Sequence, residues 1–262
     1  MSIQNSTTML SPEQKPCSYC WEEKILTREH IIPRGWYSKT ASIKKPLIIG
    51  ACLDCNRDKS VDDEWVRKWL VSMTADRSSS AMEVLRGPVA RSIKYKPKLG
   101  RDVMDRMKLV DVYHQPTGLY LGMQTQISIS DDDWSRVVGH VDKIIQGLYA
   151  LDNQRPLPTG FGVLSFYACD EWIKPIPAMF QPFRQYLPWP QAWHISDPET
   201  FFYGRAYADD CGYSIWFTVF YNSVAFLSFV GRHEWLEQNR MRFAEQRINR
   251  DFTQKYGLKE VR

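Results

Sequence analysis

The pattern of hydrophobic and polar positions predicts that the chain opens with two short strands and a helix. Residues 26–32 and 47–50 are rich in β-branched and apolar residues, and Pro33 ends the first run. A short helical turn over 54–59 precedes a longer helix that starts at about residue 60, where large apolar residues recur every fourth position. The polar residues 1–15 have no such pattern, so we expect a loose leader there.

The rest of the chain predicts a second unit of mixed α and β structure. Residues 107–114 and 119–129 flank a Gln-Pro-Thr-Gly turn, which is typical of a β-hairpin. Three aspartates after Ser130 mark the start of a helix with an apolar face. The other predicted elements are a helix over 78–94 interrupted at Gly87-Pro88, a loop over 152–160, antiparallel strands over 201–207, 213–220 and 224–230, and a charged helix over about 234–256.

Composition supports a folded protein and places its positive charge near the N-terminus. Of 262 residues, 44% are hydrophobic and 24% are charged, which argues against global disorder. The net charge is +4, but residues 1–100 alone hold 17 Lys or Arg against 11 Asp or Glu. This imbalance would attract a phosphate backbone, although a basic solvated surface explains it equally well.

Six cysteines fall into two groups. Cys17/Cys20 and Cys52/Cys55 form two Cys-x-x-Cys pairs, the spacing of a tetrahedral zinc site with four sulfur ligands. Two separate redox motifs are the alternative, but the thioredoxin-like βαβ pattern is absent from the sequence. Zinc with four thiolates has no open coordination position, so we expect it to be structural. The other two, Cys169 and Cys211, stand alone in apolar or aromatic surroundings and are expected to be ordinary buried thiols.

The sequence predicts a cytoplasmic protein. Its N-terminus lacks the basic and apolar regions of a secretory signal, and its densest apolar run, 215–230, is interrupted and too short to span a bilayer. Thiols in a reducing compartment fit this prediction.

Between the cysteine pairs lie residues suited to chemistry. His30 is a candidate general base, because an ordinary imidazole is largely neutral at cellular pH. The carboxylate of Glu29 and the amide oxygen of Asn56 are suitable ligands for Mg²⁺. Taken singly, each has an ordinary interpretation: a packed histidine, a surface charge and a helix cap.

Together these residues resemble a known family. The succession Cys-x-x-Cys, Glu-His-Ile-Ile-Pro and Cys-x-x-Cys-Asn-x-x-Lys-Ser resembles the HNH endonucleases (His-Me finger, ββα-metal), in their zinc-bearing subgroup with four cysteines. The likeness covers about residues 15–75. It implies that His30 activates water, and that Glu29 and Asn56 hold a catalytic Mg²⁺ or Mn²⁺ at the scissile phosphate of DNA, double- or single-stranded.

Three positions depart from the family pattern. Glu29 stands where aspartate is frequent, Lys45-Pro46-Leu47 occupies the place of a common asparagine, and Asn56 replaces the final histidine. Asp58 is then a further candidate ligand. These departures leave the ligand set open and motivate an alternative function, a catalytically degenerate, zinc-stabilised protein that binds nucleic acid or acts as an adaptor.

The expected fold class is therefore α+β, with an HNH module over 16–75 and an α+β domain over 76–262 that recognises the substrate or a partner. The family resemblance also suggests a mobile-element or anti-phage defence setting, with a sensor subunit as partner. Trp36 and Tyr37 are expected either to stack on a base or to lie in the core or beside the zinc site. Phosphate contacts are expected from the basic residues of the module, Arg28, Arg34, Lys39, Lys44, Lys45, Arg57 and Lys59.

Overall fold

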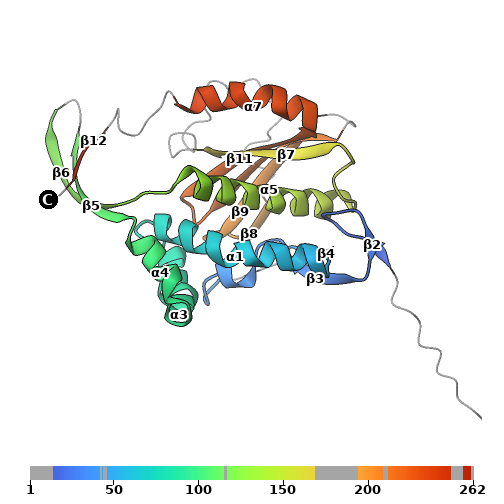
Figure 1. Ribbon diagram of the computed structural model, residues 1–262, viewed down its shortest axis with the longest axis horizontal. Coiled ribbons are helices and arrows are strands. Elements are labelled where there is room, and N and C mark those ends of the chain that lie inside the picture. The colour runs from blue at the N-terminus through green and yellow to red at the C-terminus, as the bar shows by residue number, and fades with distance from the viewer. Residues whose placement is uncertain are drawn as a thin grey trace, which may run out of the picture.

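The computed structural model describes residues 14–41, 43, 46–114, 117–168, 194–208, 212–248 and 256–260 (Figure 1). The predicted leader therefore lies outside the described residues except for its last two positions. So do Cys169, Cys211, Lys44 and Lys45.

The first unit has the predicted order of two strands and a helix. After the short pair β1 (Lys15–Pro16) and β2 (Glu23–Lys24), strand β3 (Leu26–His30) pairs antiparallel with β4 (Ile48–Cys52). Between them lies a 3₁₀ turn, η1 (Arg34–Trp36). Helix α1 (Leu53–Thr74) follows β4 without a loop.

Helix α1 is continuous, whereas the sequence predicted a new helix at Ser60. The Ser60 hydroxyl donates to the carbonyl of Arg57 at 2.7 Å, so it serves a bond inside the helix rather than capping a new one. With no loop between β4 and α1, the second cysteine pair spans the junction of strand and helix.

The next segment crosses α1 as a chain of short helices. These are α2 (Ser79–Val84), the π-helical turn η2 (Leu85–Val89), α3 (Ala90–Tyr95) and α4 (Pro97–Met104). The predicted interruption of helix 78–94 is the π-turn around Pro88, where the missing N–H prevents a regular helical bond. Helix α4 was not predicted.

The predicted hairpin is present. Strands β5 (Met107–His114) and β6 (Leu119–Ile127) pair antiparallel, and β12 (Tyr256–Glu260) joins the free side of β5. In Figure 1 this three-stranded sheet projects from one end of the molecule. Because Tyr256 begins β12, the last predicted helix was too long: α7 covers His233–Ile248.

A five-stranded antiparallel sheet forms the centre of the molecule, in the order β7-β11-β10-β9-β8. The three predicted strands are confirmed as β9 (Phe201–Ala208), β10 (Tyr213–Phe220) and β11 (Val224–Arg232). Two strands were missed, β7 (Phe161–Ala168) and β8 (His194–Asp197).

Helices cover both faces of this sheet (Figure 1). The predicted helix after Ser130 is α5 (Asp131–Asn153), which packs on β7 and β11, while α7 packs on the opposite face of the same strands. Both faces of the sheet are apolar, as strand β10 illustrates. Trp216 and Phe220 face the α5 side, whereas Phe217 and Val219 face the α7 side.

The first unit shares the core on the α5 side of the sheet. One buried cluster contains Ile31, Trp36 and Trp69 together with residues of α5 and of the sheet, so the predicted boundary near residue 75 falls within a common core. Gly147 permits this close packing, since a Cβ there would stand 3.1 Å from side-chain atoms of Ile31 and Tyr19.

A turn residue makes a second link between the two units. Tyr221 is fully buried with a positive φ of 52°, and its hydroxyl donates to the carbonyl of Trp36 at 2.7 Å. Asn222 also has a positive φ, as a tight hairpin turn requires. Of the two readings for Trp36 and Tyr37, burial of both side chains supports the core position.

Candidate functional site

The four cysteines of the two pairs converge at one end of the first unit. Their sulfur atoms all lie within 4.8 Å of one another, and Cys17 and Cys52 are buried. Among the described residues, this is the one group of three or more His, Cys, Asp or Glu side chains close enough to hold a metal ion. Four sulfurs at this separation can bind a metal such as zinc.

Backbone amides already favour a thiolate at Cys17. Burial of the thiol raises its pKa, but the N–H groups of Cys52, Cys20 and Tyr19 lower it by more, and the resulting pKa is about 7. Two of these contacts are the N–H of Cys52 at 3.2 Å and that of Tyr19 at 3.5 Å from Sγ. Because metals bind the thiolate, these amides prepare Cys17 as a ligand.

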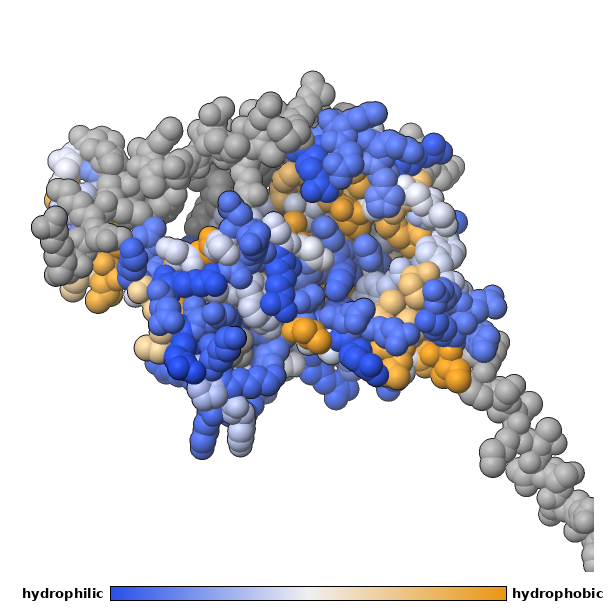
Figure 2. All heavy atoms as spheres, viewed as in Figure 1, coloured by the Kyte–Doolittle hydropathy of each residue, from blue (hydrophilic) through white to orange (hydrophobic). Residues whose placement is uncertain are grey.

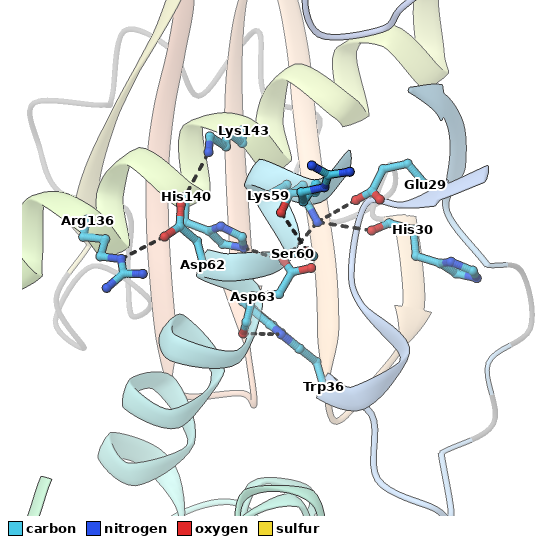
Figure 3. A network of polar contacts seen from close by, with 11 residues as sticks. Glu29, His30, Trp36, Lys59, Ser60, Asp62, Asp63, Arg136, His140 and Lys143 are labelled. Atoms are coloured by element: carbon cyan, nitrogen blue, oxygen red, sulfur yellow. Dashed lines mark hydrogen bonds and ion pairs between the residues drawn. The ribbon is translucent and has the colours of Figure 1, made fainter. Parts of the chain in front are cut away.

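Glu29 lies on the buried face of β3, where Lys59 of α1 meets it (Figure 3). Lys59 Nζ is 2.9 Å from Glu29 Oε1, and the two side chains are 1% and 7% exposed. Burial raises the pKa of Glu29, and the nearby ammonium partly opposes this shift. A positive charge therefore already stands beside the carboxylate that was expected to bind a metal ion.

The same ammonium extends the network toward α5. Lys59 Nζ also lies 3.1 Å from Asp63 Oδ1, and that oxygen is 3.1 Å from Nε2 of His140 on α5. His140 is buried and stacks on Trp36, whose indole N–H donates to the carbonyl of Asp63. We call Glu29, Lys59, Asp63 and His140 the Lys59 network.

Burial lowers the pKa of His140, against the opposing effect of Asp63, so the imidazole is neutral at pH 7. The network thus contains one ammonium and two carboxylates in a nearly dry environment. It joins β3, α1 and α5, and the adjacent Asp62 adds ion pairs to Arg136 and Lys143 at 2.8 and 3.4 Å (Figure 3).

His30 occupies the other face of β3. Its ring points away from the Lys59 network in Figure 3 and is partly exposed. Nε2 accepts a hydrogen bond from Nε of Arg34 at 3.1 Å, which places the lone pair on Nε2 and the proton on Nδ1. Partial burial, and then the charges of Arg34, Arg28 and Lys59, lower the pKa of His30.

Asn56 contacts β3 at a different residue. Its side-chain Nδ2 donates to the hydroxyl of Thr27 at 2.9 Å, so Asn56 ties α1 to the strand. Glu29 and Asn56, the expected ligands of a catalytic cation, are thus each paired with a side chain of the protein, Lys59 and Thr27 respectively.

The basic residues that were predicted to contact phosphate differ in the exposure of their side chains. Arg28, Arg34, Lys39 and Arg57 all have exposed side chains. Lys59 does not, and its prediction as a phosphate contact is corrected: its charge is held inside the protein by Glu29 and Asp63. Arg28 shares the His30 face of β3, because residues two apart point to the same side of a strand.

Sequence reasoning assigned no role to His140 and considered Asp63 only as part of a helix cap with Ser60. A signal for His140 existed, because it falls in the apolar stripe of α5 between Val137 and Ile144, where a polar side chain must be buried. Its neighbours Trp36 and Asp63 lie at least 77 positions away in the sequence, so nothing local identified them.

Comparisons of this chain with protein-family models, with curated proteins and with solved structures found no match. No helix among the described residues is both long and apolar enough to cross a membrane. Three features of the first unit bear on its function: the cysteine cluster, the partly exposed His30 and the exposed arginines.

Proposed function

We propose that this protein is a metal-dependent endonuclease of the HNH type that hydrolyses phosphodiester bonds in DNA. The observation that carries the proposal is the position of His30. It ends the first strand of a strand-strand-helix unit, is partly exposed, and stands beside Arg34 and on the same face as Arg28. A neutral imidazole next to guanidinium groups is suited to act on water near a bound phosphate.

In this proposal, Arg34 and His30 act in sequence. Arg34 turns its guanidinium from Nε2 of His30 to the phosphate, which frees the imidazole lone pair. Nε2 then takes a proton from water, and the oxygen forms a bond to phosphorus while the bond to the 3′-oxygen breaks. The leaving oxygen takes up a proton from solvent. A bound divalent cation would stabilise the negative charge that develops on the phosphate.

The cysteine cluster has a structural role in this proposal. Zinc held by Cys17, Cys20, Cys52 and Cys55 fixes the start of α1 to the segment before β3, and so holds both sides of the module in place. The C-terminal α+β unit would recognise the substrate or a partner protein.

The test is DNA cleavage by the purified full chain and by His30→Ala. Supercoiled plasmid and single-stranded DNA are incubated with each protein in Mg²⁺, in Mn²⁺ or in EDTA. We expect metal-dependent cleavage that falls by about 100-fold or more in His30→Ala, the usual contribution of a general base. His233→Ala, at the start of α7, is the matched control and should cleave normally. Equal cleavage by wild type and His30→Ala would reject the proposed base.

A second candidate function is binding of nucleic acid without cleavage. The Glu29–Lys59 ion pair favours it, because a lysine ammonium already pairs with the carboxylate that was expected to bind the catalytic cation. DNA binding that weakens with salt, together with no cleavage in either metal, would support this function. Arg28→Ala and Arg57→Ala should then weaken binding, while His30→Ala should leave it nearly unchanged.

A further inference from the structure

The β5–β6 hairpin exposes an unusual number of large apolar side chains. Leu109, Leu119 and Met123 are 57, 63 and 61% exposed, and Met107, Tyr120 and Leu121 are 42–50% exposed. Figure 2 shows hydrophobic atoms at the surface on this projecting end. Single exposed apolar residues are ordinary, but a contiguous group marks an interaction surface.

The two faces of the hairpin differ. Val110 and Val112 of β5 are buried, which covers one face. The opposite face carries Met107 and Leu109, and the register places Met123 of β6 opposite Asp111 on that same side. One face of the hairpin is therefore packed against other residues of the protein. The apolar residues on the opposite face stay exposed, and we infer that they contact a partner.

The hairpin also presents a strand edge without charge. In the sheet order β12-β5-β6, both β12 and β6 are edge strands among the residues that the structure describes. The sequence of β12 includes Lys259 and Glu260, whereas none of the nine residues of β6 is charged. Proteins commonly place charged residues on an edge strand to prevent pairing with another chain, and β6 lacks this protection.

Part of this edge is regular enough to pair. The register of β5 with β6 shifts between Val112 and Tyr113, opposite the segment containing Gly122, whose φ is +115°. From Gly122 to Ile127 the pairing with β5 is continuous. Six consecutive residues therefore offer an ordered, uncharged edge to another strand.

We propose that β6 pairs antiparallel with β6 of a second copy of this chain, which joins the two three-stranded sheets across a two-fold axis. The edge is compatible with itself because residues 122–127 are all neutral, so two copies bring no like charges together. Met123 and the neighbouring Leu121, apolar residues of β6 itself, are 61 and 49% exposed, so pairing along this strand would bury part of their surface.

The first measurement is the mass of the full chain by light scattering during size exclusion, over a hundredfold range of protein concentration. We expect a concentration-dependent mass that approaches twice 30.7 kDa. Backbone amides of residues 122–127 should exchange hydrogen slowly at high concentration and faster on dilution, because pairing would protect them. A chain that stays monomeric throughout, with fast exchange in β6, would overturn the proposal.

The second measurement uses Thr125→Lys, at the centre of the regular edge, where the two-fold axis would bring two lysines together. The dimer dissociation constant should rise by about 100-fold or more, with the melting temperature kept near that of wild type. Met123→Lys is a second variant for the same edge. Val61→Lys, at an exposed apolar position on α1, is the control and should dimerise normally. A dimer that persists in both edge variants would place the interface elsewhere. None of these results depends on nuclease activity.

Discussion

Two polar centres hold the first unit together, and they differ in how the chain builds them. The cysteine cluster joins two short motifs, each with both members three residues apart. The Lys59 network instead brings single residues from β3, α1 and α5 to one buried ammonium. The cluster could hold an external cation, whereas the network contains its own. The comparison shows that two adjacent sites in one small unit can balance buried negative charge in two different ways.

The largest expected effect is loss of the cysteine cluster. Cys52→Ser removes a buried ligand where β4 meets α1, and apparent zinc-binding free energies of about 10–16 kcal/mol couple to folding in small modules. We expect the zinc content to fall from about one per chain to near zero and the melting temperature to fall by more than about 10 °C. Metal analysis and calorimetry measure these. Ser18→Ala, between the first two cysteines, should retain zinc; normal zinc content in Cys52→Ser would remove this residue from the site.

The next effect is loss of the internal cation. Lys59→Met leaves the carboxylates of Glu29 and Asp63 without their ammonium partner, and breaking such a buried pair costs about 3–5 kcal/mol. Urea unfolding measures this change. Adding Glu29→Gln should restore part of the loss, because one uncompensated charge is then removed. Lys39→Met, at an exposed lysine, should change stability by less than about 0.5 kcal/mol. Equal effects of the two lysine substitutions would contradict the network.

The third expected effect concerns Asp142, a buried carboxylate that is not paired with a lysine in this way. Burial raises the pKa of Asp142 on α5 to about 7, although Ser165 and the charge of Arg240 oppose the shift, and its Oδ1 has no hydrogen-bond partner among the described residues. The folded protein then keeps this proton up to about pH 7, while the unfolded chain releases it near pH 4. The contribution of Asp142 to stability therefore declines as pH rises from about 4 to about 7.

Asp142→Asn should remove that decline. We expect it to raise the free energy of unfolding by up to about 4 kcal/mol at pH 8, since the two pKa values differ by about three units, and to have little effect at pH 4, where the native carboxyl is protonated. Thermal unfolding over this pH range measures the difference. Asp62→Asn, at a carboxylate paired with Arg136 and Lys143, should instead lower stability at pH 8. A gain at pH 8 that equals the change at pH 4 would show that charge is not the cause.

The smallest effect is at Asn56. Asn56→Ala loses one side-chain hydrogen bond to Thr27 and should cost about 1 kcal/mol, measured by urea unfolding. Thr27→Val removes the same bond from the other side and also the bond from the Thr27 hydroxyl to the carbonyl of Ala51 at 2.9 Å, so the double variant should be about as stable as Thr27→Val alone. A much larger loss would give Asn56 a further role in the module.

Several features followed directly from local sequence. The strand-strand-helix order, the β5–β6 hairpin and the strands β9, β10 and β11 were all predicted, because each has a short-range pattern of apolar residues or turn formers. The convergence of the four cysteines was also predicted, since their pairs have ligand spacing. Strands β7 and β8 were missed. The first follows a Pro/Gly-rich loop, and the second has only four residues, too few to establish a period.

The candidate site was predicted less completely. Strand alternation implies that the adjacent Glu29 and His30 lie on opposite sides of β3, as observed, but it could not show which side would be buried. Lys59 was grouped with exposed basic residues because a lysine in a charged helical segment is usually solvated. Its ion-pair partner Asp63 lies only four residues away in the sequence. The burial of Lys59, however, depends on Trp36 and His140, which come from distant segments and stack on each other beside this pair.

The sequence by itself determined that this chain carries a four-cysteine metal motif around a Glu-His pair, because residue type and spacing are sufficient to specify ligands. Only the tertiary structure decided the environment of each member of that pair. Packing of α1 and α5 against one face of β3 removed water from Glu29 and supplied Lys59, while the other face left His30 within reach of solvent and of Arg34. Burial and charge balance arise from contacts between segments that are far apart in the chain, and local patterns cannot encode them.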